Sequence, residues 1–418
     1  MAPRRPLSVL IGHILIGLGA LILLGIGGLF GLALMSRRTS PGAGAAPQPL
    51  LVMGTPIASP TGEAVPTDVA PPTATALPLP TPHGFDFAPT IAPTVVVTVP
   101  TAEPWSGPNK PFNWHGSGSR LGLHVSRNSS PSFMQFVRET HPTVMKAVDD
   151  VGFLAEVKKV SPGTVTVGRF VVDQSGMGQG NPIEKADEFV QANLARYQAN
   201  PGVDFWEGWN EPDPGQMDWY AQFEARRACR MYELGFRAAV GGFSTGTPEM
   251  DQFLKFLPAI RAAYHCGGIL TLHEYGAPTF DLWFGKGLPG MPEYEDRGVL
   301  AFRYRWWYRD VLIPAGLRIP LVVSEAGVDG LVAMGRRPGP AGPGWLAFRD
   351  WWRAQGLTDN AEQFYVDQLA WYDKLAQQDP YMIGFCVYGA GGADLPGQET
   401  YELSSIMPLI TAYVKANR

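Results

Sequence analysis

Two stretches of the sequence decide the fold that we expect: Trp209-Asn210-Glu211-Pro212 and Val322-Val323-Ser324-Glu325-Ala326-Gly327. Each stretch belongs to an apolar run of the kind that forms a buried strand, and each run ends at or near a glutamate. In a barrel of parallel strands, chemistry sits where the carboxyl ends of the strands open. We therefore expect the carboxylates of Glu211 and Glu325 to meet at one mouth.

The chain from about residue 105 onward alternates apolar strand-like runs with amphipathic helical ones. We expect eight strands, at 121–126, 143–149, 165–172, 205–211, 238–244, 269–275, 321–325 and 383–388. We expect helices at 184–198, 219–234, 250–263, 300–311, 360–377 and 402–416. This alternation predicts an α/β fold, a (β/α)8 TIM barrel in one domain. Glu211 then ends the fourth strand and Glu325 the seventh.

Residues 1–38 are predicted to be a transmembrane helix that anchors the protein in the membrane. Their uncharged stretch, residues 7–35, has arginines on both sides and exceeds the roughly 7–15 residues of a signal-peptide core. A signal peptide cleaved near residues 43–45 is the alternative. Residues 39–104 are rich in proline and threonine and are expected to form a disordered linker. The protein would then be a single-pass protein of the cell membrane, with its domain at 105–418 outside the cytoplasm.

Charge and cysteine content narrow the choice of partners. The net charge is −5 and the basic residues are scattered, which argues against nucleic acid as a partner. No C-x-x-C motif occurs among the three cysteines, so we expect no structural zinc, and we predict neither a metal nor an organic cofactor. Cys386 is expected to be a buried apolar residue. A bridge between Cys229 and Cys266 is open, because spacing does not place them within reach.

Two carboxyl groups at the mouth of a barrel are the usual equipment for cleaving a glycosidic bond. Retention of configuration needs them about 5–5.5 Å apart, with one protonated and the other ionised. Mutual repulsion in a partly dry site is expected to push their pKa values apart. The alternative is that Glu211 and Glu325 are ordinary strand-end carboxylates bonded to loop amides.

The two motifs resemble those of the glycoside hydrolases of clan A, which include families 5 and 39. Asn210-Glu211-Pro212 resembles the Asn-Glu motif of strand four, Ser324-Glu325-Ala326-Gly327 resembles the motif of strand seven, and the resemblance extends from about residue 121 to the end. It implies a retaining enzyme that cleaves β-glycosidic bonds of a poly- or oligosaccharide. Glu211 would be the acid/base, Glu325 the nucleophile, and Asn210 a ligand of the sugar 2-hydroxyl.

Other strands supply further candidate ligands of the carbohydrate. In the resembling families a tyrosine at the position of Tyr275 hydrogen-bonds the nucleophile, and strand alternation puts His273 on the same face. His124 is expected to line the pocket from the first strand. Tyr388 stands where the resembling families usually carry a tryptophan. Trp209, beside Asn210, completes the candidates. For His273 and Tyr275 the alternative is a side chain satisfied inside the barrel.

Two basic residues, Lys146 and Arg169, fall within apolar strands, where a charge rarely stays unpaired. We expect an interior salt bridge with Glu207. If Arg169 instead reaches the top of the barrel, it would orient Glu325, and Arg169 also stays among the candidate substrate ligands.

Several alternatives remain open from sequence alone. Aromatic residues in the long loops at 276–298 and 327–359 either form sugar platforms or pack onto the barrel. Residues 242–246 have the letters of a serine-hydrolase elbow, but no helix follows at once, so we expect a glycine-rich turn. The same barrel could be a non-catalytic carbohydrate-binding domain at the cell surface or an envelope transglycosylase. The sugar and the linkage are not determined.

Overall fold

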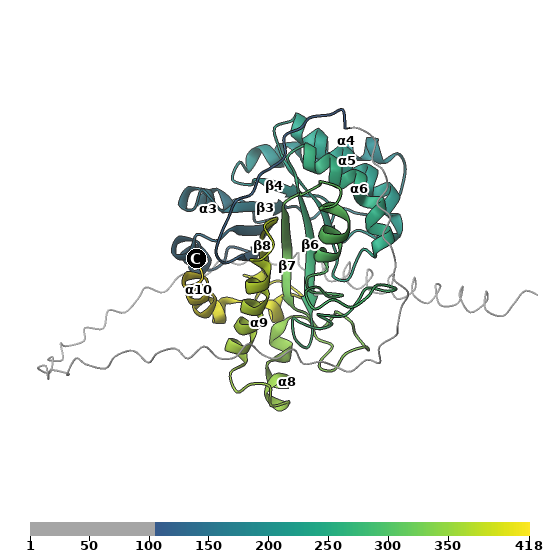
Figure 1. Ribbon diagram of the computed structural model, residues 1–418. Coiled ribbons are helices and arrows are strands. Elements are labelled where there is room, and N and C mark those ends of the chain that lie inside the picture. The colour runs from purple at the N-terminus through teal and green to yellow at the C-terminus, as the bar shows by residue number, and fades with distance from the viewer. Residues whose placement is uncertain (1–104) are drawn as a thin grey trace, which may run out of the picture. The chain divides into compact units, whose positions relative to one another are not determined.

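The computed structural model describes residues 105–418, in which eight parallel strands close into a barrel (Figure 1). The strands follow one another around the barrel in chain order, and the first pairs with the eighth to close it. The predicted (β/α)8 barrel is therefore confirmed. The predicted membrane helix (1–38) and linker (39–104) lie outside the described residues. Within 105–418, no helix has both the length and the apolar character needed to cross a bilayer.

All eight predicted strands are present. They are β1 (Leu121–Val125), β2 (Val144–Val148), β3 (Val165–Arg169), β4 (Phe205–Glu207), β5 (Ala238–Phe243), β6 (Ile269–Gly276), β7 (Leu321–Val328) and β8 (Met382–Ala390).

The fourth strand differs most from the expectation, because β4 ends at Glu207 and not at Glu211. Beyond it, the backbone amide of Asn210 donates to the side chain of Gln174. Glu211 has a φ of 48°, in the left-handed region that residues other than glycine do not adopt in a regular strand. Glu211 therefore lies on the loop after β4, and its orientation is set by that loop.

Five of the six predicted helices are confirmed to within a few residues. They are α4 (Pro182–Ala199), α5 (Met217–Glu233), α6 (Met250–His265), α9 (Ala361–Ala376) and α10 (Met407–Ala416). The helix predicted at 300–311 is instead the short α7 (Tyr304–Trp307), continued by a π-helical turn, η2 (Tyr308–Leu312).

Three helices were not predicted: α2 (Pro131–Thr140), α3 (Leu154–Val160) and α8 (Arg349–Ala354). For α2 the sequence held a signal, since Ser130 caps the helix and proline occupies its first turn. Short 3-10 turns complete the structure: η1 (Pro214–Gln216), η3 (Trp345–Phe348), η4 (Glu399–Tyr401) and η5 (Ser404–Ile406).

Two apolar layers hold the barrel together. The larger one lies between the strands and the surrounding helices. A smaller cluster fills the barrel interior, includes the buried Cys386 as predicted, and has Phe112 and Trp114 packed against it. Trp114 also donates to the carbonyl of Met382, the first residue of β8. The segment before β1 therefore covers the amino ends of the strands, and the charged interior side chains belong to the opposite, carboxyl end.

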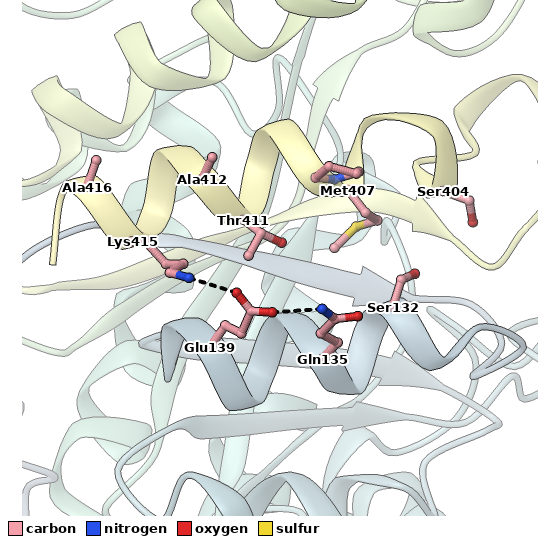
Figure 2. Close-up of a pocket in the computed structure, with 10 residues that line it drawn as sticks. Ser132, Gln135, Glu139, Ser404, Met407, Thr411, Ala412, Lys415 and Ala416 are labelled. Atoms are coloured by element: carbon pink, nitrogen blue, oxygen red, sulfur yellow. Dashed lines mark hydrogen bonds and ion pairs between the residues drawn. The ribbon is translucent and has the colours of Figure 1, made fainter. Parts of the chain in front are cut away.

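A groove of about 690 Å³ runs between α2 and α10, where Lys415 pairs with Glu139 at 2.8 Å (Figure 2). Serine, threonine, alanine and methionine side chains form much of its wall. None of the residues that the sequence nominates for chemistry lines this groove, so the candidate site has to be sought at the barrel mouth.

The helices are tied to the strands by buried polar contacts as well as by packing. Arg227 of α5 is completely buried, pairs with Glu224 at 2.7 Å, and donates to the backbone carbonyls of Trp206 in β4 and Ala239 in β5. A disulfide between Cys229 and Cys266 joins α5 to the end of α6. The spacing of the cysteines in the sequence had left this pairing open. The short β4 is therefore held from outside by α5.

Replacing Arg227 with methionine should destabilise the domain by about 3–5 kcal/mol, because Glu224 would keep a buried charge without a partner. Urea unfolding of the purified protein followed by fluorescence measures this loss. Arg230→Met is the matched control: its pair with Glu233 is 2.8 Å long but partly exposed, and should contribute less than about 1 kcal/mol. Equal losses in both variants would contradict the role given to Arg227.

Candidate active site

Glu211 and Glu325 are brought together at the carboxyl end of the barrel. Glu325 lies within β7, and Glu211 lies on the loop after β4. His273 of β6 joins them, since its Nδ1 atom is 2.8 Å from Glu211 Oε1 and 3.6 Å from Glu325 Oε2. Both carboxylates therefore belong to one polar cluster.

Glu325 is buried and surrounded by hydrogen-bond donors. Its Oε1 atom lies 3.1 Å from Nζ of Lys146 and 3.4 Å from a guanidinium nitrogen of Arg169. Its Oε2 atom accepts a hydrogen bond of 3.1 Å from the hydroxyl of Tyr275, the contact that the resemblance implied. Burial by itself would raise the pKa of the Glu325 carboxyl, but the charges of His273 and Lys146 hold it well below its usual range. Glu325 is therefore ionised at neutral pH.

Lys146 is completely buried and lies between two carboxylates. Its Nζ atom is 2.8 Å from Glu207 Oε2, as well as 3.1 Å from Glu325. The predicted interior salt bridge is therefore present for Lys146, whereas Arg169 reaches Glu325, as the alternative had it. Burial opposes ionisation of Glu207, yet Lys146 and Arg169 lower its pKa to about 2.

Glu211 is more open than Glu325, with 38% of its side chain exposed. Burial alone would raise the pKa of Glu211, but the hydrogen bond and charge of His273 outweigh burial and hold the pKa below its usual value. We had expected one of the two carboxyl groups to be kept protonated. The lowered pKa of Glu211 differs from that expectation, because His273, nominated as a sugar ligand, contacts Glu211 itself.

The backbone around Glu211 is held by the loop after β3 and by the end of β5. Gln174, on the loop after β3, accepts from the amide of Asn210 at 2.5 Å and donates to its carbonyl at 2.9 Å. The amide of Glu211 donates to the carbonyl of Gly242 at 2.9 Å. These contacts stabilise the left-handed conformation of Glu211, which otherwise costs about 1–3 kcal/mol.

The carboxyl end of β5 and the turn after it support Glu211. Gly242 has a φ of 58°, and a Cβ atom there would lie only 2.9 Å from the carbonyl oxygen of Trp209. Ser244 lies close enough to the Glu211 carboxylate to help lower its pKa. Residues 242 and 243 of the predicted turn belong to β5, and the turn itself follows them. Together they shape the acidic site.

His124 and Tyr388 lie beside Glu325, on the side where β1 meets β8. Nδ1 of His124 is 3.6 Å from Glu325 Oε1, and its ring meets the ring of Tyr388 edge-on at 4.7 Å. Burial and the nearby charge of Lys146 keep the pKa of His124 well below its usual value, so His124 is neutral at neutral pH. A neutral imidazole and a phenol are both suited to hydroxyl groups.

Within residues 105–418, Asn210 has a side-chain oxygen that is free to bind a ligand, whereas the side chain of Trp209 is taken up by packing. The side-chain oxygen of Asn210 is buried and has no hydrogen-bond partner among the described residues. The indole of Trp209 is buried and stacks on Trp219 and Phe223 of α5, at 5.6 and 4.6 Å between ring centres. Trp209 therefore packs the loop against α5, and its ring faces are already covered.

Sequence reasoning missed two residues that hold the site. Gln174 clamps Asn210, as described above. Thr245 accepts from the amide of Tyr275 at 3.1 Å and donates to the carbonyl of His273 at 3.3 Å, which joins the loop after β5 to β6. In the sequence, the only sign of Gln174 and Thr245 was that each follows the end of a strand. Side chains that hold a backbone in this way have no sequence motif by which to find them.

The aromatic residues of the loop at 327–359 mainly pack onto the barrel. Trp345, Phe348 and Trp352 are fully buried, and Trp345 stacks on Tyr365 of α9. Trp351 is only half-buried, so it faces a different way from Trp352. In this loop the packing alternative therefore accounts for three of the four large aromatic rings.

The link between His273 and Glu211 predicts a specific titration. In His273→Ala the carboxyl of Glu211 keeps its burial but loses its hydrogen bond and its neighbouring charge, so its pKa should rise above that of the wild type. An NMR titration of carboxyl-labelled glutamate, with the signal assigned by its loss in Glu211→Gln, measures the change. His265→Ala, which alters a histidine that contacts Asn109 and Trp105, should leave Glu211 unchanged. An unmoved Glu211 signal in His273→Ala would disprove the link.

No protein-family model and no curated protein sequence matches the chain. Among solved structures, similar ones include an endo-1,4-β-D-mannanase from Thermotoga petrophila, at 10% identity and a TM-score of 0.40 over 72% of this chain and 100% of that one. A glucosidase from Croceicoccus marinus has 10% identity and a TM-score of 0.45, over 73% of this chain and 68% of its own. A modular endo-β-1,4-mannanase from Cellulomonas fimi has 14% identity and a TM-score of 0.39, over 71% and 70%. These similar structures are glycoside hydrolases.

Proposed function

We propose that residues 105–418 form a retaining glycoside hydrolase of the clan A type, which cleaves β-glycosidic bonds of a poly- or oligosaccharide. The observation that carries the proposal is that one histidine nitrogen lies 2.8 Å from Glu211 and 3.6 Å from Glu325. Laid end to end, these two distances give the greatest separation that the two oxygens can have. Both carboxylates are therefore close enough to act on one glycosidic bond, and retention is what the resemblance to clan A implies.

In the first step, Glu325 attacks the anomeric carbon as the glycosidic C–O bond breaks. The buried and ionised state of Glu325 suits a nucleophile, since water does not screen it. Glu211 gives a proton to the leaving oxygen, and its partial exposure leaves room for the leaving group. The product is an ester between Glu325 and the sugar.

The proton for the leaving oxygen has to be on Glu211 when the sugar is bound. With the site open to water, the lowered pKa of Glu211 favours the carboxylate. A bound sugar removes water from around Glu211, which favours its neutral form, and the 2.8 Å contact with Nδ1 of His273 supplies the path for the proton.

In the second step, water attacks the anomeric carbon of the ester. Glu211 accepts the proton of that water, and the bond between the sugar and Glu325 breaks to restore the carboxylate. Tyr275 holds Glu325 in place throughout, and Asn210 binds the 2-hydroxyl. His124, His273, Arg169 and Tyr388 contact the rest of the sugar.

The composition of residues 1–104 supports a location for this enzyme at the cell membrane. Residues 1–38 anchor it as a single-pass protein of the cell membrane, and residues 39–104 space it from the surface. The barrel then acts outside the cytoplasm, where polysaccharides occur.

Glu325→Gln should lower kcat on aryl β-glycosides by about a thousandfold or more, because it removes the nucleophile. Glu211→Ala should lose far less on substrates with activated leaving groups than on poor ones, because those groups need little proton assistance. Initial rates across a panel of aryl glycosides and polysaccharides measure both effects, with Glu233→Gln of the exposed face of α5 as control. Equal activity in wild type and both site variants would refute the assignment, and binding without turnover in all of them would favour a tethering barrel.

A further inference from the structure

We infer that Glu207 is a positioning residue that keeps Lys146 paired while Glu325 gives up its negative charge to the sugar. This inference rests on the proposed function, since it concerns the carboxylate that forms the ester. It adds a third carboxylate to the chemistry, on a strand that supplies neither of the reacting groups.

Lys146 is a cation shared between two anions. Its ammonium group lies 2.8 Å from Glu207, 3.1 Å from Glu325 and 3.3 Å from the hydroxyl of Ser324. The three charged side chains come from β2, β4 and β7, and at most 8% of any of them is exposed. Water therefore does little to screen these charges, and the charge of each affects the other two.

Among the described residues, Glu207 ties no backbone amide or hydroxyl of another element to β4. Neither of its oxygens accepts a hydrogen bond from a backbone amide or a hydroxyl in residues 105–418. Buried Glu274 is different, because it accepts from the amide of Phe302 and the hydroxyl of Tyr372 and so ties β6 to other elements. The close partner that Glu207 does have is Lys146.

The reaction changes the number of charges in this cluster. When Glu325 forms the ester, its carboxylate becomes neutral and Lys146 loses one of its two anions. A buried cation without a partner is unfavourable. In the free enzyme, Glu207 lies 2.8 Å from the ammonium group of Lys146. Because Glu207 takes no part in the ester, Lys146 keeps this partner after the ester has formed. Glu207 therefore lowers the free energy of the ester relative to that of the free enzyme.

Glu207 also limits how strongly Lys146 holds Glu325. Titratable groups of six strands and one loop surround that carboxylate: His124, Lys146, Arg169, Glu207, Glu211, His273, Tyr275 and Tyr388. Without Glu207, Lys146 would pair with Glu325 alone, and Glu325 would become a weaker nucleophile and a better leaving group. Ester formation should then slow while ester hydrolysis does not.

The test is Glu207→Gln in the full-length protein, assayed with aryl β-glycosides. We expect kcat/KM, which reports ester formation, to fall by about ten- to a hundredfold. The rate of ester hydrolysis, measured from the decay of an ester trapped with an activated fluoroglycoside, should be unchanged or higher. Equal loss in both steps, as general damage to the site would cause, overturns the inference.

A second variant tests charge balance directly. Lys146→Met combined with Glu207→Gln removes one positive and one negative charge, so Glu325 no longer faces an unbalanced lysine. Ester formation should recover severalfold relative to Glu207→Gln alone. A double variant that is slower still would count against the inference, because a merely structural role predicts additive damage.

A measurement without turnover separates this inference from the proposed function. An NMR titration of Glu325, assigned by loss of its signal in Glu325→Gln, should show a lower pKa in Glu207→Gln than in the wild type. Glu224→Gln is the matched control, because Glu224 is also fully buried beside a cation, Arg227, but in α5. It should lower stability and leave the pKa of Glu325 alone.

These experiments distinguish failure of the inference about Glu207 from failure of the proposed function. If Glu325→Gln is inactive but Glu207→Gln matches the wild type in both rates and in the titration of Glu325, the proposed function stands and this inference fails. If the wild type turns over no glycoside, the proposed function fails. The titration then decides the coupling by itself, and an unmoved Glu325 overturns it.

Discussion

The rest of the site depends on one constraint, which is that the negative charge of Glu325 is buried in the barrel interior. Removing the Glu325 carboxylate from water is unfavourable unless partners surround it. Lys146 and Arg169 lie within 3.4 Å of one oxygen, and Tyr275 donates to the other. Each of these partners comes from a different strand, so the closed barrel is needed to collect them.

The asymmetry between the two carboxylates follows from where the chain places them. Glu325 is part of a long, fully buried strand, whereas Glu211 lies four residues beyond the end of the short β4. Leaving the strand gives Glu211 its exposure and its left-handed backbone, and contacts with Gly242 stabilise that conformation. One carboxylate is thus buried and ionised, and the other can meet solvent and exchange a proton.

His273 and Lys146 connect the acidic groups into one electrostatic unit. His273 touches Glu211 and lies near Glu325, and Lys146 touches Glu325 and Glu207. A proton or charge that leaves one carboxylate therefore changes the free energy of the others. The hydrogen bond and charge of His273 explain why the pKa of Glu211 is held below its usual value in the free protein, although burial and the charge of Glu325 would raise it.

The sequence by itself determined the eight strands, their order and the two glutamates at the barrel mouth. Apolar runs and glycosidase-like motifs are local patterns, and local patterns can be found without coordinates. It did not determine the end of β4, the clamp of Gln174 on Asn210, the partner of His273 or the Cys229–Cys266 bridge. Only the tertiary structure decided these, because each depends on distances between strands and loops that are far apart in the chain. The same holds for Lys146: its burial could be expected from its apolar neighbours, but its two anions became known only when the barrel closed around it.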